Sequence, residues 1–420
     1  MLDLPAIRDD PGPARAALER RGAGAALDDL LELDARRRQL LPEVESRRAA
    51  QNQASEEIAA AKRAGEDAGP LIERMKQVAA EAKRLSAELA EVEERRDSLA
   101  ATLPNLPDPH APDGGPEDAV TLREVGERPR FEFEVRDHLD LGLEHGWIEI
   151  EKAAEASGSR FAYLLGDLVM VELALIRFAV ETVRAEGYEP VVPPVLVREG
   201  PLYGTGYFPA EREMIYEIER DELFLVGTSE VSLAALHAGD ILDGGELPRR
   251  YAGISTCFRR EAGAAGKDTR GIFRVHQFDK VEMFSFVRPE ESPAEHERML
   301  AIEERILSAL ELPYRVVDIP IGDLGAPAAR KFDCEAWIPS QERYRELTSC
   351  SNTTDFQARR LGARYRPEAD APAAPVHTLN GTAVAVSRTL LALIENGQRA
   401  DGSGALPQAL IDAGAPASIG

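Results

Sequence analysis

The stretch YAGISTCFRREAGAAGKDTRGIFRVHQFDKVEMF, residues 251–284, decides the fold of this chain. Two segments with alternating apolar and polar residues flank a charged, glycine-rich loop, a pattern that predicts an antiparallel hairpin. Residues two apart share one face of a strand. The second segment therefore places on one side Arg274, His276, Phe278, Lys280 and Glu282. An Arg can bind a phosphate, a Phe ring can stack on a purine and a carboxylate can bind an ammonium group. This row is therefore suited to ATP beside an amino acid. The alternative is a salt-bridged hairpin on a solvated sheet face.

Length, charge and cysteine content limit the possible classes of protein. The chain has 420 residues, enough for two or three domains, and a net charge of -24. Such an acidic chain lacks the basic footprint of a nucleic-acid-binding protein, unless a basic patch is local. The cysteines Cys257, Cys334 and Cys350 form no CxxC pair, which favours a reduced intracellular protein without structural zinc. Because signal-peptide features and apolar runs of about 18 residues are both absent from the sequence, we expect a cytoplasmic protein with no membrane partner.

A coiled-coil pattern occupies the N-terminal quarter of the chain. Apolar residues in the segment 71–102 recur at alternating intervals of three and four, and a similar, more polar seam precedes them. The turn-forming sequence GEDAGP at 65–70 separates the two seams. The pattern predicts an antiparallel helical arm over residues 1–103. Residues 104–118 are rich in Pro, Gly and Asp, which indicates a linker before a second domain at 119–420.

Four further stretches in the second domain carry polar residues at or near strand and helix ends. They are GYEPVVPPVLV from Gly187, TSE at 228–230, RELTS at 345–349 and HTLNGTAVAVSRTLLALIEN at 377–396. The first is extended and contains prolines, and TSE alone has the composition of a helix N-cap. The last is a glycine-bearing turn that runs into an apolar helix. Together with the hairpin, these stretches predict an α+β fold.

Three elements follow one another along the chain in the order of three family motifs. They are the stretch from Gly187, the hairpin with FRRE at 258–261 and the helix with Arg388. Through these elements the chain resembles the class II aminoacyl-tRNA synthetases, most closely the seryl-tRNA synthetase family, over nearly its whole length. The resemblance implies a class II catalytic domain, an antiparallel sheet flanked by helices, after the coiled-coil arm. It also implies a homodimer that forms through the motif 1 stretch from Gly187.

The activity implied by this resemblance is that of a serine–tRNA ligase. Such an enzyme uses ATP and Mg²⁺ to activate L-serine as seryl-adenylate, and it then transfers the serine to the 3′-terminal adenosine of tRNA(Ser). The tRNA for selenocysteine, tRNA(Sec), is a further expected acceptor.

The resemblance also assigns roles to individual residues. Arg259 would hold the α-phosphate, Arg388 the γ-phosphate, Glu261 the adenine amino group and Phe278 the adenine ring. The catalytic residues would be Arg259, Arg388 and Glu346, and the metal ligands Glu346 and Ser349. The whole set expected around ATP is Arg259, Arg260, Glu261, Val275, Phe278, Glu346, Leu347, Thr348, Ser349 and Arg388. The set expected around serine is Thr228, Ser229, Glu230, Arg274, Glu282, Asn380 and Thr382, with Arg274 on the carboxylate and Glu282 on the ammonium or hydroxyl group.

The arm is expected to grip the long variable arm of tRNA(Ser), while the catalytic domain takes the acceptor end. This expectation comes from the resemblance, because residues 28–102 contain 13 basic and 17 acidic side chains. Charged flanks of a coiled coil are ordinarily solvated surface. The basic cluster on the first helix that could meet the RNA backbone consists of Arg36, Arg37, Arg38, Arg47 and Arg48.

Two other functions fit parts of the sequence. A class II-like enzyme that loads an amino acid on a carrier protein would share the catalytic domain, but such enzymes lack the long arm that this chain has. A non-catalytic coiled-coil protein with a decayed synthetase domain would have lost charged residues that this chain keeps. Those residues are Arg259, Glu261, Glu346 and Arg388.

Overall fold

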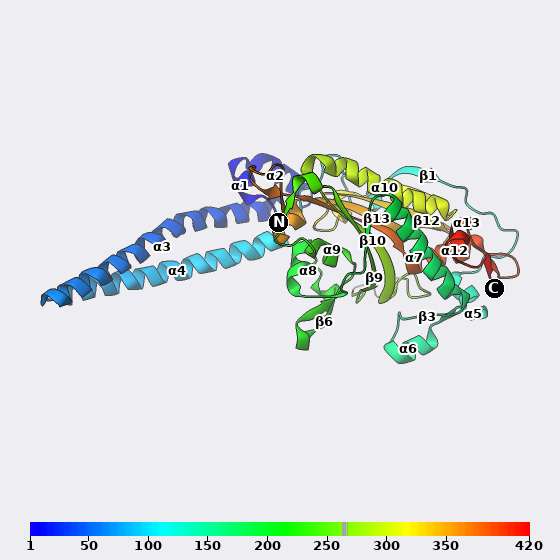
Figure 1. The fold of residues 1–420 in the computed structure, drawn as a ribbon, viewed down its shortest axis with the longest axis horizontal. Helices are drawn as coiled ribbons and strands as arrows, with labels where there is room; N and C mark the ends of the chain where they lie inside the picture. The colour runs from blue at the N-terminus through cyan, green and yellow to red at the C-terminus, as the bar shows by residue number, and fades with distance from the viewer. Residues whose placement is uncertain (263–265, 267) are drawn as a thin grey trace. The chain divides into compact units, whose positions relative to one another are not determined.

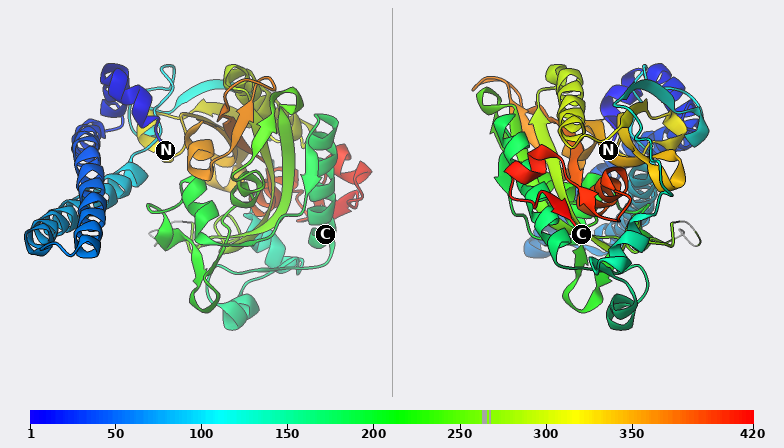
Figure 2. Two further views of the ribbon diagram at one scale, coloured as in Figure 1. Left: turned by 60° about the vertical axis from the view of Figure 1, so that its left-hand side comes forward. Right: turned by 90° about the vertical axis from the view of Figure 1, so that its right-hand side faces the viewer.

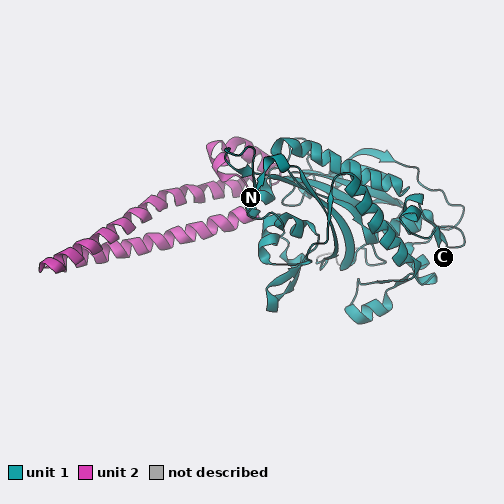
Figure 3. Ribbon diagram, in the orientation of Figure 1, with its two compact units in different colours: residues 1, 104–420 teal, residues 2–103 magenta. Residues whose placement is uncertain are grey.

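The computed structural model describes residues 1–262, 266 and 268–420. Residues 263–265 and 267, in the middle of the predicted hairpin loop, lie outside this part. The described chain divides into two compact units, one of residues 2–103 and one of Met1 with residues 104–420 (Figure 3). No helix among the described residues is long and apolar enough to cross a membrane.

The unit of residues 2–103 is entirely helical. Its helices are α1 (Leu4–Asp9), α2 (Pro11–Glu19), α3 (Gly24–Ala64) and α4 (Gly69–Thr102). The two long helices lie side by side (Figure 1), and Leu40 and Val44 of α3 pack on Leu85, Leu89 and Val92 of α4. Helix α3 ends at Gly65, whose φ of 73° lets its N–H turn back to the last carbonyl groups of the helix. The predicted antiparallel coiled-coil arm is confirmed.

The larger unit is built around an eight-stranded sheet, seen from two further directions in Figure 2. In spatial order its strands are β1 (Val120–Val125), β11 (Tyr314–Asp318), β12 (Arg330–Ile338), β13 (Arg343–Thr354), β16 (His377–Ala385), β10 (Gln277–Val287), β9 (Arg249–Phe258) and β4 (Glu189–Val191). Every neighbouring pair is antiparallel except β4 and β9. The predicted α+β class, with an antiparallel sheet flanked by helices, is confirmed.

Helices α7, α10 and α12 supply much of the apolar surface that covers the sheet. The helices of this unit are α5 (His138–Glu144), α6 (Glu151–Ser157), α7 (Asp167–Ala185), α8 (Glu199–Thr205), α9 (Glu230–Ala235), α10 (Ser292–Ala309), α11 (Phe356–Leu361), α12 (Val386–Gly397) and α13 (Gln408–Asp412). Its short strands are β2 (Ile148–Glu149), β3 (Tyr163–Leu164), β5 (Leu196–Val197), β6 (Tyr216–Ile218), β7 (Leu223–Leu225), β8 (Ile241–Asp243), β14 (Arg364–Arg366), β15 (Ala374–Pro375), β17 (Gly404–Ala405) and β18 (Ser418–Ile419).

The predicted hairpin forms, but its second strand is shorter than the sequence indicated. Strands β9 and β10 pair from Phe258 with Gln277 onward, so Arg274 and His276 precede the strand. The placement of these two residues in the strand was wrong. The reason is that the backbone N–H of His276 donates to Arg160, while the carbonyl of Arg259 contacts the imidazole Nδ1 of His276. The regular ladder therefore ends at Gln277, although the N–H of Arg259 still donates to the carbonyl of His276 at 2.9 Å.

Residues 104–118 are packed against the larger unit rather than extended between two domains. Asn105 is 3% exposed, and its side-chain amide donates to the carbonyl groups of Pro327 and Thr353 at 2.9 and 2.8 Å. The N–H of Ile321 donates to the carbonyl of Pro112. A segment that sequence composition identifies as a linker is thus anchored by buried hydrogen bonds that composition does not reveal.

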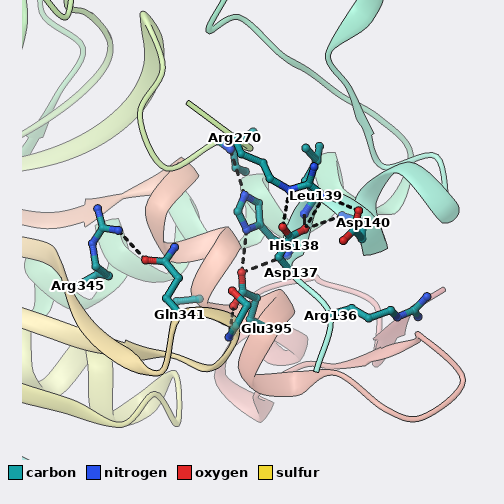
Figure 4. Close-up of polar contacts among 12 residues, drawn as sticks. Arg136, Asp137, His138, Leu139, Asp140, Arg270, Gln341, Arg345 and Glu395 are labelled. Carbon is teal, nitrogen blue, oxygen red and sulfur yellow. Dashed lines mark hydrogen bonds and ion pairs between the residues drawn. The ribbon is translucent and has the colours of Figure 1, made fainter. Parts of the chain in front are cut away.

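A buried hydrogen-bond network fixes the end of the hairpin loop to α5 and α12 (Figure 4). The N–H and Nδ1 of His138 both contact Oε1 of Glu395, at 3.1 and 2.8 Å. The N–H of Ile272 donates to Nε2 of the same imidazole at 3.1 Å, so the ring proton must lie on Nδ1. Arg270 adds an ion pair with Asp137. The chain therefore leaves the loop along a fixed path.

We predict that Gly271→Ala destabilises the protein more than an ordinary glycine substitution does. Gly271 has a φ of 75°, and a Cβ atom there would lie 1.9 Å from Nε2 of His138. Gly146 has a φ of 69° and open space around it, which makes Gly146→Ala the matched control. The control should lose about 1–2 kcal/mol from backbone strain alone. Gly271→Ala should lose about 1–3 kcal/mol more, because the buried N–H of Ile272 loses its acceptor.

The measurement is the free energy of unfolding of both variants from urea denaturation followed by circular dichroism. An equal loss in the two variants would show that the contact between Gly271 and His138 does not constrain the loop.

Candidate active site

The alternation of side chains along the central strands separates a polar face from an apolar one. On the apolar face, Thr348 donates to Glu303 of α10 at 2.8 Å, and Phe332 stacks on His296 of the same helix. Side chains one residue away in each strand point to the opposite face. That face carries Lys331 and Asp333 of β12, Ser349 and Ser351 of β13, Asn380 and Thr382 of β16, and Phe278 and Lys280 of β10.

Three arginines and two glutamates surround a cavity of about 220 Å³ on this face, which we call the arginine cavity. The guanidinium of Arg259 lies 5.4 Å from the Phe278 ring centroid, and its Nε donates to the carbonyl of Gly227 at 3.1 Å. These contacts orient the guanidinium between the ring and the start of α9. The lining residues include Arg259, Glu261, Phe273, Arg274, Phe278, Lys331, Glu346, Ser349 and Arg388.

Ion pairs hold the other charged groups of the arginine cavity. Arg274 contacts Glu261 at 2.5 Å. Arg388 donates to the carbonyl of Glu346 at 3.0 Å and lies 3.3 Å from its carboxylate. Burial by itself would raise the pKa of the Glu346 carboxyl, but the charges of Lys331, Arg388 and Arg259 lower that pKa to about 2. Glu346 is therefore an anion at neutral pH, within a group of cations.

A second cavity of about 240 Å³, the Glu230 cavity, adjoins the first. Oε1 of Glu230 accepts from Nε2 of Gln357 at 2.7 Å and from Nδ2 of Asn380 at 2.9 Å. The N–H of Glu230 donates to Oγ1 of Thr228 at 3.2 Å, whereas Ser229, the N-cap residue of α9, makes no side-chain capping hydrogen bond. Burial and the charge of Glu282 raise the pKa of Glu230 to about 7. The cavity is about as large as the arginine cavity, and its lining combines apolar residues with side chains that can donate or accept hydrogen bonds.

Most residues expected around ATP line the arginine cavity. They are Arg259, Glu261, Val275, Phe278, Glu346, Leu347, Ser349 and Arg388. Thr348 points to Glu303 on the other face, and Arg260 has its guanidinium 6.0 Å from the Tyr216 ring. Neither side chain lines the cavity.

The residues expected around serine are divided between the two cavities and the protein interior. Glu230 and Asn380 line the Glu230 cavity, whereas Arg274 and Thr382 line the arginine cavity. The remaining three are buried: Thr228, Ser229 and Glu282. The carboxylate of Glu282 contacts Nζ of Lys280 at 2.5 Å and the hydroxyl of Thr382 at 3.5 Å.

Several polar residues in or beside the two cavities had no role in the sequence expectations. The period of two had already placed Lys280 in the strand row, and Lys331 alternates with Asp333 in the same way, so the same period could have found it. Tyr207 and Glu211 belong to an irregular segment without any periodicity. Gln357 reaches Glu230 from α11, a contact between residues far apart in the sequence.

Comparisons with known proteins agree with this arrangement. Residues 1–107 match the family described as seryl-tRNA synthetase N-terminal domain, and residues 214–397 match the tRNA synthetase class II core domain (G, H, P, S and T). Serine–tRNA ligase of Acidothermus cellulolyticus is 51% identical over 98% of this chain and 97% of that protein. The corresponding ligase of Streptomyces coelicolor is 49% identical over 98% and 96%.

Solved structures give the same answer in three dimensions. Seryl-tRNA synthetase from Pyrococcus horikoshii, complexed with ATP, superimposes with a TM-score of 0.91 and 40% identity, over 100% of this chain and 99% of that one. Cytoplasmic serine–tRNA ligase from Naegleria fowleri, in complex with AMP, gives a TM-score of 0.84 and 31% identity over 98% and 95%. On these grounds the chain belongs to the seryl-tRNA synthetase family of class II aminoacyl-tRNA synthetases.

Proposed function

We propose that this protein activates L-serine with ATP to form seryl-adenylate and then transfers the serine to the 3′-terminal adenosine of tRNA(Ser). The observation that carries the proposal is the pair of adjoining cavities on one face of the sheet. One of them is lined by arginines and an aromatic ring, and the lining of the other includes Glu230 and Asn380, which can hydrogen-bond an amino acid. Relatives along the full length of the chain are serine–tRNA ligases. The site of action is then the cytoplasm, and tRNA(Sec) is a further acceptor to test.

In the arginine cavity, ATP would lie with its adenine against Phe278 and its triphosphate between Arg259 and Arg388. The polyphosphate carries several negative charges, and guanidinium groups bind phosphate oxygens in pairs of hydrogen bonds. Glu261 is assigned to the adenine amino group. Its present ion pair with Arg274 holds the carboxylate at the cavity. Prebuilt cations of this kind stabilise the charge on the reacting phosphorus without costly rearrangement.

Magnesium fits the donors at Glu346 and Ser349. Mg²⁺ prefers oxygen ligands and is commonly bound by one or two carboxylates together with substrate phosphates. The ionised Glu346 and the hydroxyl of Ser349 both line the arginine cavity. No group of three or more His, Cys, Asp or Glu side chains among the described residues could hold a metal by itself, which agrees with a metal that arrives with ATP. When bound, Mg²⁺ would neutralise charge on the phosphates.

Serine is assigned to the Glu230 cavity and its boundary with the arginine cavity. Glu230 and Asn380 offer hydrogen bonds to an ammonium or hydroxyl group. Thr382 of β16 and Glu282 of β10 pair with each other in neighbouring strands. A site that hydrogen-bonds a hydroxyl rejects alanine strongly, because its own polar groups would remain unpaired. We retain Arg274 as a candidate for the serine carboxylate, although its contacts lie on the nucleotide side.

The helical arm is assigned to tRNA(Ser), whose long variable arm it would contact. The proposed contacts are Arg36, Arg37, Arg38, Arg47 and Arg48. Four of these arginines are ion-paired: Arg37 contacts Glu93 at 2.8 Å and Arg47 contacts Glu81 at 3.2 Å, for example. Exposed pairs of this type contribute little free energy, about 0–1 kcal/mol each, so phosphates can replace the carboxylates.

Dimerisation through the motif 1 region is also part of the proposal. Helix α7 exposes Met170 and Leu173, which are 49% and 55% exposed, and Val192 after β4 is 82% exposed. Leu173 and Ile176 of α7 also line an apolar hollow on the surface together with Ile254 of β9. Apolar surface of this kind is what a partner subunit covers in a homodimer.

We predict that Arg259→Ala strongly reduces activation. Loss of a preorganised donor to the reacting phosphate should cost about 2.7–4 kcal/mol of transition-state stabilisation, which is about 10²–10³ in rate. The measurement is serine-dependent pyrophosphate exchange. Arg364→Ala, at an exposed arginine of β14, is the control and should leave exchange unchanged. Near-normal exchange in Arg259→Ala would contradict the assignment of the nucleotide site.

We predict that serine supports pyrophosphate exchange far better than alanine, threonine or cysteine. Alanine leaves the polar groups of the cavity unpaired, and threonine adds a methyl group beside the hydroxyl that those groups would bind. The measurement compares kcat/KM for the four amino acids with the same enzyme preparation. A preference for any of the other three would refute the proposed serine pocket.

We predict that removal of residues 28–102 leaves adenylate formation nearly intact but strongly weakens aminoacylation of tRNA(Ser). Charge reversal at Arg47 and Arg48 should weaken tRNA binding and lower its salt dependence, by about one unit of slope for each lost phosphate contact. The measurements are tRNA affinity against salt concentration and serine activation. Reversal at Arg364 and Arg366, outside the arm, changes net charge equally and is the control.

Equal loss of activation and aminoacylation after the deletion would mean that the arm supports the fold. Unchanged aminoacylation would mean that the arm serves another partner.

A further inference from the structure

The two cavities of the site have only two described lining residues in common, Arg259 and Lys331. Residues that line one cavity alone can contact only one of the two bound substrates. Residues that line both lie at the boundary where the substrates meet. Arg259 was expected at the nucleotide from the sequence, whereas Lys331 had no assigned role.

The position of the Lys331 ammonium group is fixed by its own strand. Lys331 and Asp333 lie two apart in β12, on the polar face. Nζ of Lys331 is 2.9 and 3.1 Å from the two carboxylate oxygens of Asp333. Asp333 in turn pairs across the sheet with Ser349, a residue of the arginine cavity. The ammonium group is thus held beside the nucleotide site by a carboxylate whose side chain is 8% exposed.

The other cations of the arginine cavity are placed differently. Arg274 is bound to Glu261, Arg388 to Glu346, and neither lines the Glu230 cavity. Lys280 forms a buried pair with Glu282 and also lines the arginine cavity alone. The side chain of Lys331 is 22% exposed, which leaves part of its surface open to a ligand.

The reaction requires positive charge at this boundary. A carboxylate oxygen of serine attacks the α-phosphorus of ATP, a new oxygen–phosphorus bond forms, and the bond from the α-phosphorus to the bridging oxygen breaks. Pyrophosphate leaves with that electron pair, and no proton moves. Two anions must approach each other, and negative charge then grows on the leaving group. Fixed cations beside the reacting atoms lower this barrier because the site excludes water.

We propose that Lys331 is a further catalytic cation of the activation step, beside Arg259 and Arg388, which contacts the serine carboxylate and the α-phosphate together from the side of β12. Asp333 is its positioning residue. This inference rests on the proposed function, and it adds a residue to that site rather than a new site. Arg259, which directly follows β9, and Lys331 of β12 would approach the reacting atoms from opposite sides of β10, β16 and β13 in the sheet.

A purely structural role for Lys331 is the alternative, because a buried carboxylate needs a counter-charge. The two roles differ when both charges are removed together. If Lys331 serves only to neutralise Asp333, then Lys331→Met should be harmful and the double variant with Asp333→Asn should recover. If Lys331 acts on the substrates, the double variant recovers its stability but not its rate.

The experiment measures serine-dependent pyrophosphate exchange and the thermal unfolding midpoint for four variants of the full chain. They are Lys331→Met, Lys331→Arg, Asp333→Asn and the double variant of Lys331→Met with Asp333→Asn. We expect Lys331→Met to lose about 10²-fold in kcat/KM, on the scale of other preorganised donors. Lys331→Arg should lose less, because it keeps the charge. Asp333→Asn should fall between wild type and Lys331→Met, and the double variant should remain at the level of Lys331→Met.

Three results would overturn the proposal. The first is a kcat/KM of Lys331→Met in the exchange reaction that stays within about threefold of wild type. Such a loss is smaller than the tenfold change that corresponds to about 1.4 kcal/mol. The second is recovery of exchange in the double variant to the level of Asp333→Asn. The third is an equal loss in Asp333→Asn and Lys331→Met, because the pair would then act as one structural unit. A wild-type enzyme without serine-dependent exchange would instead refute the proposed function itself.

Discussion

The antiparallel ladder from β9 through β10, β16 and β13 to β12 is the constraint on which the rest of the structure depends. Because backbone hydrogen bonds fix the register, alternate side chains of five strands must share one face. Helix α10 covers the other face with apolar contacts. The polar residues thereby collect on the open face, although they come from segments up to about a hundred residues apart.

Each charged side chain on that face is held by a partner of opposite charge, a carbonyl group or an aromatic ring. Glu346 lies among three cations and stays ionised, whereas Glu230 has a raised pKa because burial and another carboxylate oppose its charge. Arg259 is held by a carbonyl group and an aromatic ring, and Arg274 by Glu261. Side chains that are already held in place lose little conformational entropy when substrates bind, which is the basis of preorganised electrostatic catalysis.

The same principle applies to the arginines of the arm, which we propose as contacts for tRNA. The arginines of α3 are paired with carboxylates of α3 and α4, so the arm has no large unbalanced positive field. Pairs at 29–53% side-chain exposure are weak and exchangeable. A polyanion with closely spaced phosphates can compete for such arginines, while isolated anions gain little from doing so.

The sequence by itself determined the elements and their chemistry. The heptad period fixed the helical arm, because a seam at 3.5 residues per turn can be buried only against another helix. The period of two around Phe278 and Lys280 predicted a strand with a functional face, and the resemblance to class II synthetases implied Arg259, Glu346 and Arg388 as candidates. These signals are local, since each depends on neighbours within a few residues.

Tertiary structure alone decided which of these residues meet. Thr348 had been expected beside ATP, but the tertiary structure placed it against Glu303, because the pleat of β13 directs its side chain to α10. It began β10 at Gln277, after Arg274, packed Asn105 into the larger unit and brought Gln357 to Glu230. It also set Lys331 at the boundary of both cavities. Contacts between residues so far apart follow from the order and register of the strands, and no local pattern in the sequence records that order.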